Sequence, residues 1–259
     1  MLLLVAVVSS LDGPLTSLVS NCAWVSNQFL LGSGVMVSPV LEEGATSVSA
    51  VFPPGTWYNL FDTSKAVLSP PGSGTTVKLD APLNEINVHL HQNTILPLQR
   101  GGTISRDARA TPFTLVVAFP FGATDADAEG AVYVDDDERP AMVLVEGQAT
   151  YARFYAAVRG GKEVMVQSQV SKGSFSMNKG LVIEKITVLG LHGAGRDLAI
   201  QVDGSDAAAI ATSSPYFAGA DGEEEAIEDG KKSVTMEVGG LALPLGRSFT
   251  MTWNMHIEA

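Results

Sequence analysis

An acidic segment that begins at Asp125 has the residue types and spacing of a calcium-binding loop. Asp125, Asp127 and Glu129 fall on alternating ligand positions of the calcium template. Gly130 stands where that loop must turn sharply, and Asp136 falls on the last ligand position. The flanking residues, however, read as strands, whereas such a loop lies between two helices. The pattern therefore favours a β-hairpin with solvated carboxylates at its tip, and a weak calcium site made by Asp125, Asp127 and Asp136 is the alternative.

Two histidines, His89 and His91, alternate with apolar residues and therefore project from one face of a predicted strand. This spacing suits two ligands of a zinc ion, which needs at least one more protein ligand. Neither His192 nor His256 has a local spacing that would complete such a site. The sequence predicts histidines on the polar face of the strand rather than a metal centre.

Two aromatic residues, Trp57 and Tyr58, stand at the start of another predicted strand. Aromatic faces suit the apolar C–H patches of pyranose rings, so an exposed pair would bind carbohydrate. Aromatic residues at the start of a strand more often fill the core of a β-sandwich. Solvent exposure of the two rings distinguishes these interpretations.

The composition excludes several classes of partner. The chain has 259 residues, of which 46% are hydrophobic, enough to bury substantial cores. It carries 16 basic and 28 acidic residues, and the net charge of −12 repels nucleic-acid phosphates and anionic lipid. We therefore expect neither nucleic acid nor a membrane as a partner. The single cysteine, Cys22, excludes an intrachain disulfide.

The N-terminal segment, residues 1–26, differs from the rest of the chain. Residues 1–8 are apolar but too few to span a bilayer, and no Lys or Arg precedes Lys65. A signal peptide would normally begin with a positively charged region. We interpret residues 1–26 as a poorly structured leader or a non-native N-terminus, with an atypical signal peptide as the alternative.

Alternating apolar and polar residues predict β-strands through most of the chain. The clearest alternation is near the C-terminus, at Phe249, Met251, Trp253, Met255 and Ile257. Similar short runs recur between turns that contain Gly or Pro, and few windows have a helical period. We predict an all-β fold class with two β-sandwich domains.

One polar interval gives the best domain boundary. Residues 99–109 contain two glycines and several charges, and they lie between two apolar strands. We predict a proximal β-domain at residues 27–104 and a distal β-sandwich domain at residues 105–259.

Several motifs follow one another in a fixed order along residues 27–259. They are Gln28-Phe-Leu-Leu-Gly32, Val35-Met-Val-Ser-Pro-Val-Leu41, Pro54-Gly-Thr-Trp-Tyr-Asn-Leu-Phe61, Asn93-Thr-Ile-Leu-Pro-Leu-Gln99 and Gly130-Ala-Val-Tyr-Val-Asp-Asp136. The series resembles the C-terminal β-domains of glycoside hydrolase family 31, the α-glucosidases and α-xylosidases, with plant-type members nearest. Two positions depart from the family pattern: Asp137 replaces the glycine of an Asp-Asp-Gly turn, and Gln92-Asn93 replaces a Gly-Gly pair.

The resemblance implies a parent enzyme that hydrolyses terminal α-linked glucose or xylose with retention and without a cofactor. Retention needs two carboxylates, which in this family are aspartates of a (β/α)8 barrel that precedes the matched segment. Their motifs do not occur in this sequence, and a barrel takes roughly 200 residues or more. We therefore assign no catalytic residue. The implied partners are the missing catalytic barrel and an α-glucan or xyloglucan oligosaccharide, and plant members of the family are commonly secreted.

The resemblance also places an apolar run at the junction with the barrel. This run comprises Phe29, Leu30, Leu31, Val35 and Met36. Without the barrel we expect it to lack its main covering and to drive self-association.

Three functions remain open on these grounds. The first is a C-terminal portion of a glycosidase without activity of its own. The second is a stand-alone carbohydrate-binding or interaction module that uses Trp57 and Tyr58. The third is an adhesive domain stabilised by calcium at the acidic segment.

Overall fold

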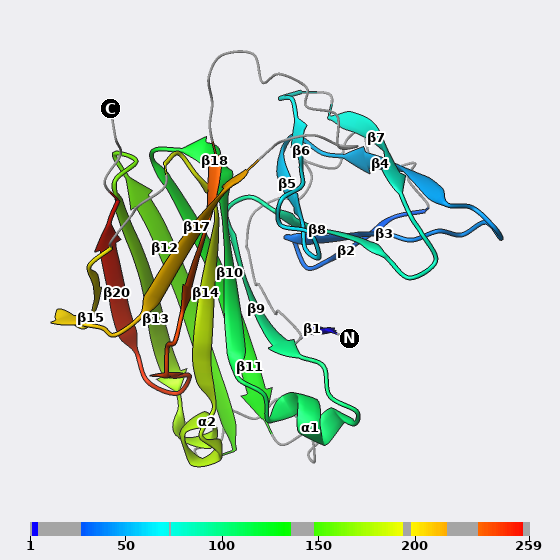
Figure 1. The fold of residues 1–259 in the computed structure, drawn as a ribbon. Helices are drawn as coiled ribbons and strands as arrows, with labels where there is room; N and C mark the ends of the chain where they lie inside the picture. The colour runs from blue at the N-terminus through cyan, green and yellow to red at the C-terminus, as the bar shows by residue number, and fades with distance from the viewer. Residues whose placement is uncertain are drawn as a thin grey trace.

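The computed structural model describes residues 2–4, 27–72, 74–135, 148–193, 198–216 and 233–255. Within these residues the chain forms a smaller β-sandwich beside a larger one (Figure 1). The predicted all-β fold class with two sandwiches is confirmed. The helices found in the described ranges, α1 (Ser105–Arg109) and α2 (Ser174–Lys179), are short. Neither is long and apolar enough to cross a membrane.

The smaller sandwich, here called the proximal sandwich, consists of a five-stranded and a two-stranded sheet. The first sheet contains, in spatial order, β2 (Phe29–Leu31), β3 (Val35–Ser38), β8 (Asn87–His91), β5 (Gly55–Asn59) and β6 (Ala66–Ser69). The second pairs β4 (Ser47–Phe52) with β7 (Thr75–Asp80). Side chains from both sheets fill the layer between them, including Met36, Phe52, Trp57 and Leu79.

The larger sandwich, here called the distal sandwich, is one 13-stranded sheet. Its strands are β1 (Leu2–Leu4), β9 (Thr94–Arg100), β10 (Phe113–Ala123), β11 (Ala126–Asp135), β12 (Ala149–Arg159), β13 (Glu163–Lys172), β14 (Val182–Leu191), β15 (Ile200–Val202), β16 (Ser205–Asp206), β17 (Ile210–Tyr216), β18 (Ser233–Gly239), β19 (Leu243–Pro244) and β20 (Phe249–Asn254). The spatial order is β16-β15-β20-β13-β12-β11-β9-β10-β14-β18-β17, with β1 beside β9 and β19 beside β14.

The distal sheet folds over itself and encloses one apolar core. Residues of β10, β14 and β18 share this core with residues of β11, β12, β13 and β20. In β20, Phe249, Met251 and Trp253 are buried and alternate with more exposed polar residues, so the predicted alternation is confirmed there. Ile257, the last apolar residue of that predicted strand, lies outside the described residues.

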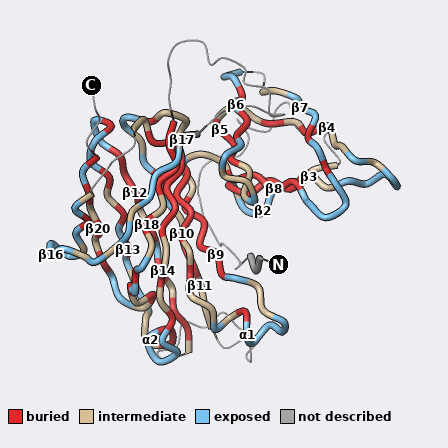
Figure 2. The backbone as a smooth tube through the Cα atoms, in the orientation of Figure 1, coloured by how far each residue is buried: buried red, intermediate tan, exposed pale blue. Residues whose placement is uncertain are grey.

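Strands β9 and β10 are buried along most of their length (Figure 2). Alternate residues of β10, such as Leu115 and Val117, face the distal core. The residues between them, such as Val116 and Ala118, pack instead against the proximal sandwich. A strand covered on both faces reads as a continuous apolar run, which is the pattern of residues 115–119.

The chain leaves the proximal sheet after β8 and enters the distal sheet at β9. Strand β9 pairs with β10 in antiparallel register from Thr94 to Gln99, and Ile95 belongs to the distal core. The proximal domain predicted at 27–104 includes these residues, but their hydrogen bonds place them in the distal sheet. The interval 99–109 contains the end of β9 and helix α1.

The apolar run that was expected to lose its covering divides into two parts. Phe29, Leu30 and Leu31 in β2 are all exposed, as expected for a segment without its covering. Val35 and Met36 in β3 are buried, contrary to that expectation. They are covered because β3 lies between β2 and β8, with Met36 facing the β4–β7 sheet and Val35 facing the distal sandwich.

Candidate functional site

The two aromatic residues considered for carbohydrate binding are both buried. Trp57 is 2% exposed and faces the layer between the two proximal sheets, where its indole N–H donates to the Pro53 carbonyl (2.9 Å). Tyr58 is 0% exposed and faces the opposite way, toward the distal sandwich. Neither ring has a free face for a sugar, so this geometry does not support a platform made by Trp57 and Tyr58.

Tyr58 connects the two sandwiches. Its hydroxyl donates a hydrogen bond to the carbonyl of Phe119 in β10 (2.8 Å). The backbone of Gly190 passes so close that a Cβ at this position would lie 2.5 Å from the Tyr58 hydroxyl. Burial raises the pKa of that hydroxyl, which keeps it a neutral donor. Tyr58 thus fixes the position of the proximal sheet on the distal sheet.

His89 lies in the core of the proximal sandwich and His91 is half-buried against Trp57, contrary to the prediction of a polar face. His89 is 2% exposed and packs edge-on against the Phe52 ring at 4.9 Å between centroids. His91 packs against the Trp57 ring at 4.4 Å. The prediction was wrong because it assumed a sheet with one solvated face, whereas β8 is covered on one side by β4 and β7 and on the other by the distal sandwich.

Burial decides the charge state of both histidines. Desolvation lowers the pKa of His89 to about 4 and also lowers the pKa of His91. His89 Nδ1 and His91 Nε2 are buried without a hydrogen-bond partner among the described residues. In the described part of the chain, no group of three or more His, Cys, Asp or Glu side chains could hold a metal ion. The histidines therefore act as neutral core residues at neutral pH.

The acidic segment forms a turn and the start of β11. The Asp125 carboxylate accepts a hydrogen bond from the Gly160 N–H (3.0 Å), and Asp127 pairs with Arg159. Both side chains thus bind groups of the neighbouring β12 end rather than each other. Asp136, the third residue of the suggested calcium site, lies outside the described residues. The calcium hypothesis stays a prediction about Asp125 and Asp127.

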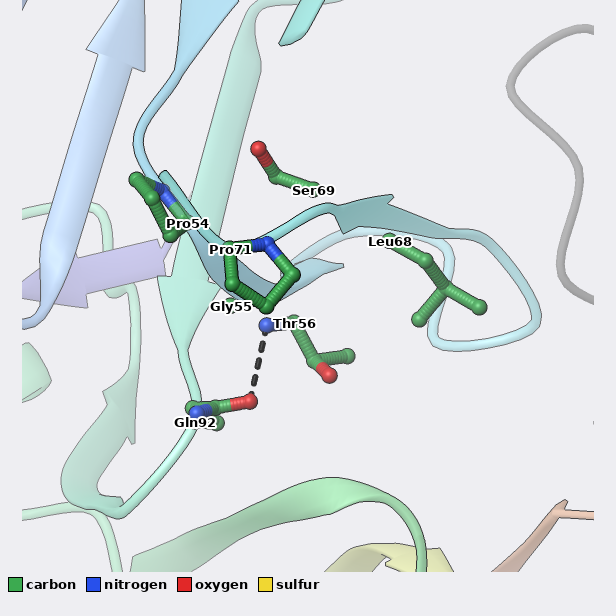
Figure 3. Close-up of a pocket in the computed structure, with 7 residues that line it drawn as sticks. All are labelled: Pro54, Gly55, Thr56, Leu68, Ser69, Pro71 and Gln92. Atoms are coloured by element: carbon green, nitrogen blue, oxygen red, sulfur yellow. Dashed lines mark hydrogen bonds between the residues drawn. The ribbon is translucent and has the colours of Figure 1, made fainter. Parts of the chain in front are cut away.

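A shallow cleft of about 370 Å³ opens on the proximal sandwich (Figure 3). Its lining is Pro54, Gly55, Thr56, Leu68, Ser69, Pro71 and Gln92. The Gln92 side chain accepts a hydrogen bond from the Thr56 N–H (2.8 Å), which holds the amide at the edge of the cleft. The lining includes no carboxylate, imidazole or thiol, so the cleft supplies no general acid or base for hydrolysis.

A further cluster of side chains, not predicted from the sequence, lies on the outward face of β11, β12 and β13. It consists of Tyr133, Tyr151, Arg153, Tyr155, Gln167 and Gln169, and is called the tyrosine face below. Residues on either side of these in the strands, such as Val132, Phe154 and Val166, belong to the distal core, so the face points away from it. The signal was present as a period of two in residues 151–155, Tyr-Ala-Arg-Phe-Tyr.

Comparison with known proteins shows which family and which longer proteins this chain resembles. The model of the glycosyl hydrolase family 31 C-terminal domain matches residues 17–96. Alpha-xylosidase 1 of Arabidopsis thaliana is 52% identical over 243 residues, which are 92% of this chain and 26% of that protein. An alpha-glucosidase of Hordeum vulgare is 35% identical over 230 residues, 88% of this chain and 24% of that protein. The chain thus spans about a quarter of the length of these curated relatives.

Solved structures share the fold. The glucosidase II alpha subunit in its DNJ-bound form has a TM-score of 0.63 at 22% identity, over 88% of this chain and 24% of that chain. A GH31 dextranase of Flavobacterium johnsoniae complexed with glucose has a TM-score of 0.56 at 14% identity, over 88% of this chain and 26% of that chain. At these identities the likeness concerns the arrangement of strands and not the ligand.

Proposed function

Since this chain belongs to glycoside hydrolase family 31, we propose that it is the C-terminal portion of a retaining α-glycosidase that removes terminal α-linked xylose or glucose. The observation that carries the proposal is the 52% identity to Alpha-xylosidase 1 of Arabidopsis thaliana across 92% of this chain. The alpha-glucosidase of Hordeum vulgare is less similar, at 35%. This difference favours xylose over glucose as the sugar that the whole enzyme releases.

Within such an enzyme, the role of these residues is structural support of a catalytic domain. The proximal and distal sandwiches share a buried layer that includes Tyr58, Leu96 and Leu189. This layer joins them into one unit on which a catalytic domain could pack. Strand β2 presents three consecutive exposed apolar side chains, Phe29, Leu30 and Leu31. The catalytic portion that the longer relatives contain would cover this strand, because an exposed apolar run of this kind marks an interaction surface.

A chimera tests this role. The C-terminal quarter of Alpha-xylosidase 1 would be replaced by residues 27–259, and hydrolysis of an aryl α-xyloside would be measured. We expect the chimera to keep most of the activity of the parent enzyme, and the 259-residue chain alone to show none. The reason for the second expectation is that the paired carboxylates of a retaining glycosidase supply many kcal/mol of transition-state stabilisation.

Two controls make the result interpretable. Alpha-xylosidase 1 truncated before its C-terminal quarter should be inactive or insoluble, which shows that the replaced part is needed. A second chimera with Leu30→Glu and Leu31→Glu should lose activity, because charges on β2 would oppose an apolar interface. A soluble, folded first chimera without activity would contradict the proposal, as would turnover by the chain alone that co-purifies with it.

A further inference from the structure

The tyrosine face is held in one arrangement by contacts among its own residues. Tyr133 and Tyr151 are directly opposite each other on neighbouring strands, and Tyr155 stands opposite Gln167. Arg153 lies between Tyr151 and Tyr155 on β12 and donates from Nε to the Tyr151 hydroxyl (3.2 Å). Its guanidinium carbon is 5.8 Å from the centre of the Tyr151 ring. Hydrogen bonds with Tyr151 and Tyr155 raise the pKa of Arg153.

Small residues lie between the large ones on this face. Ala131 stands opposite Arg153 and Ala157 opposite Met165, and both alanines point outward. They are nevertheless only 6% and 7% exposed. Neighbouring side chains therefore cover them. The tyrosines themselves are partly exposed, so each offers part of its side chain to solvent.

The size of the face suits an extended ligand. Tyr151 and Tyr155 are four residues apart on one strand, which separates them by roughly 13 Å. Gln167 and Gln169 on β13 are exposed and extend the face sideways with amide donors and acceptors. Aromatic rings with hydrogen-bonding groups at their edges match a sugar chain, whose rings have apolar faces and hydroxyl edges.

The charges around the face are balanced. Arg153 and Lys172 are exposed there, and so are Glu129 and Glu163 on the same strands. Among the described residues, Arg153 forms no ion pair with a carboxylate. Its guanidinium has five N–H donors, more than the hydrogen bonds with the two tyrosine hydroxyls use. The whole chain carries a net charge of −12, which disfavours a polyanionic ligand.

We propose that the tyrosine face binds a neutral oligosaccharide with a glucose backbone. Tyr133, Tyr151 and Tyr155 would stack on its rings, and Arg153, Gln167 and Gln169 would bind its hydroxyls. The choice of sugar class rests on the proposed function as part of an α-glycosidase, but the binding surface does not.

Calorimetric titration of the 259-residue chain tests the proposal. The ligands are a xyloglucan heptasaccharide and maltoheptaose, which distinguish the two neutral sources, and trigalacturonate as an anionic probe. We expect binding of at least one neutral ligand and none of trigalacturonate. The double variant Tyr151→Ala with Tyr155→Ala should bind about tenfold or more weakly, because two of the three stacking rings are removed.

Two matched variants serve as controls. Tyr151→Phe with Tyr155→Phe keeps both rings, so its affinity should stay within about threefold of the natural chain. Phe61→Ala removes a ring that is 57% exposed on the proximal sandwich and should not change binding. Circular dichroism and the melting temperature establish that each variant is folded.

Three results would overturn the proposal: no binding of either neutral ligand at millimolar concentration, unchanged affinity in the folded double-alanine variant, or tighter binding of trigalacturonate. None of these measurements depends on hydrolysis. Failure of the chimera in the activity assay and failure of this proposal can therefore be told apart.

Discussion

The two sandwiches differ in what fills their cores. The distal core consists of aliphatic and aromatic side chains from two layers of one folded sheet. The proximal core is smaller and includes two histidine rings that pack against Phe52 and Trp57. The proximal sheet is also covered on its second face by β9, β10 and β14. This comparison suggests that the distal sandwich is stabilised mainly by its own apolar burial, whereas the proximal sandwich depends on neutral histidines and on its neighbour.

The largest effect on stability is expected when the chain is cut between β9 and β10. A fragment of residues 105–259 lacks β9, so β10 loses a hydrogen-bonded neighbour and the distal core loses Ile95. We expect this fragment to be unfolded or aggregated, because β10 would keep only β14 as a neighbour and would become an exposed apolar edge strand. A fragment of residues 93–259 keeps β9 and should fold. Urea unfolding and amide hydrogen exchange on both fragments measure the difference.

The opposite result would be informative. If residues 105–259 fold with the same protection in β10 and β14 as the whole chain, β9 is dispensable. The domain boundary predicted from the sequence at 104/105 would then describe the folding unit, despite the pairing of β9 in the larger sheet.

The sequence predicted those features that depend on local pattern. The alternation at Phe249, Met251 and Trp253 required only the period of a strand with one buried face, and β20 has that form. His89 was misplaced because the same period does not reveal whether a second layer covers the polar face. Ile95 was assigned to the proximal sandwich because strand pairing, which joins residues distant in sequence, leaves no local signal. The polar composition of residues 99–109 is that of a linker between domains. It does not reveal that β9, which ends in this interval, pairs with β10, which follows it.

The tyrosine face also depends on strand pairing that the sequence does not reveal. Tyr151, Arg153 and Tyr155 were visible as a period of two, but Tyr133 joins them only through the pairing of β11 with β12. Trp57 and Tyr58 are adjacent aromatic residues and were considered as a carbohydrate-binding pair, but adjacent residues of a strand face opposite ways. In a sheet covered on both sides, both become buried.

The contact between the sandwiches should be sensitive to Tyr58. Tyr58→Ala removes a ring that is 0% exposed, and we expect it to lower the free energy of unfolding by about 3–5 kcal/mol. Tyr58→Phe keeps the ring but leaves the Phe119 carbonyl without its donor, at a cost of about 1–3 kcal/mol. Urea denaturation measures both values, and Phe61→Ala serves as an exposed aromatic control. Equal, small effects of the two Tyr58 variants would mean that the sandwiches are held together elsewhere.

The buried histidines should make the proximal sandwich sensitive to acid. The pKa of His89 is lowered to about 4 in the folded chain, below the ordinary value of 6.5. The unfolded chain therefore binds a proton more readily than the folded one. Stability is complete above pH 6.5, falls as the pH drops toward 4, and has then lost about 3 kcal/mol from His89. His91, whose pKa is also lowered, acts in the same direction.

No charged side chain faces these rings from the strands packed around them. Strands β3, β4, β5 and β6 contain no charged residue, and Lys78 and Asp80 of β7 are exposed. His89→Leu removes the titrating group, so its free energy of unfolding should fall less than that of the natural chain between pH 6.5 and 4.5. His192→Gln, outside the proximal core, should keep the natural pH dependence. An identical pH dependence in His89→Leu would show that His89 is protonated without cost in the folded chain.

The smallest effect is expected at the acidic turn. Asp127 and Arg159 form an ion pair, but their side chains are 73% and 50% exposed, and such surface pairs contribute about 0–1 kcal/mol. Millimolar calcium should leave the melting temperature nearly unchanged, because only a ligand that binds the folded state stabilises it. Asp125→Ala should likewise have little effect, beyond the loss of its hydrogen bond from the Gly160 N–H. Differential scanning calorimetry with calcium and with chelator provides the measurement. A rise of several degrees with calcium, abolished by Asp125→Ala, would mean that these carboxylates bind a metal ion instead of groups at the end of β12. The distal sandwich would then be stabilised by a bound ion as well as by its apolar core.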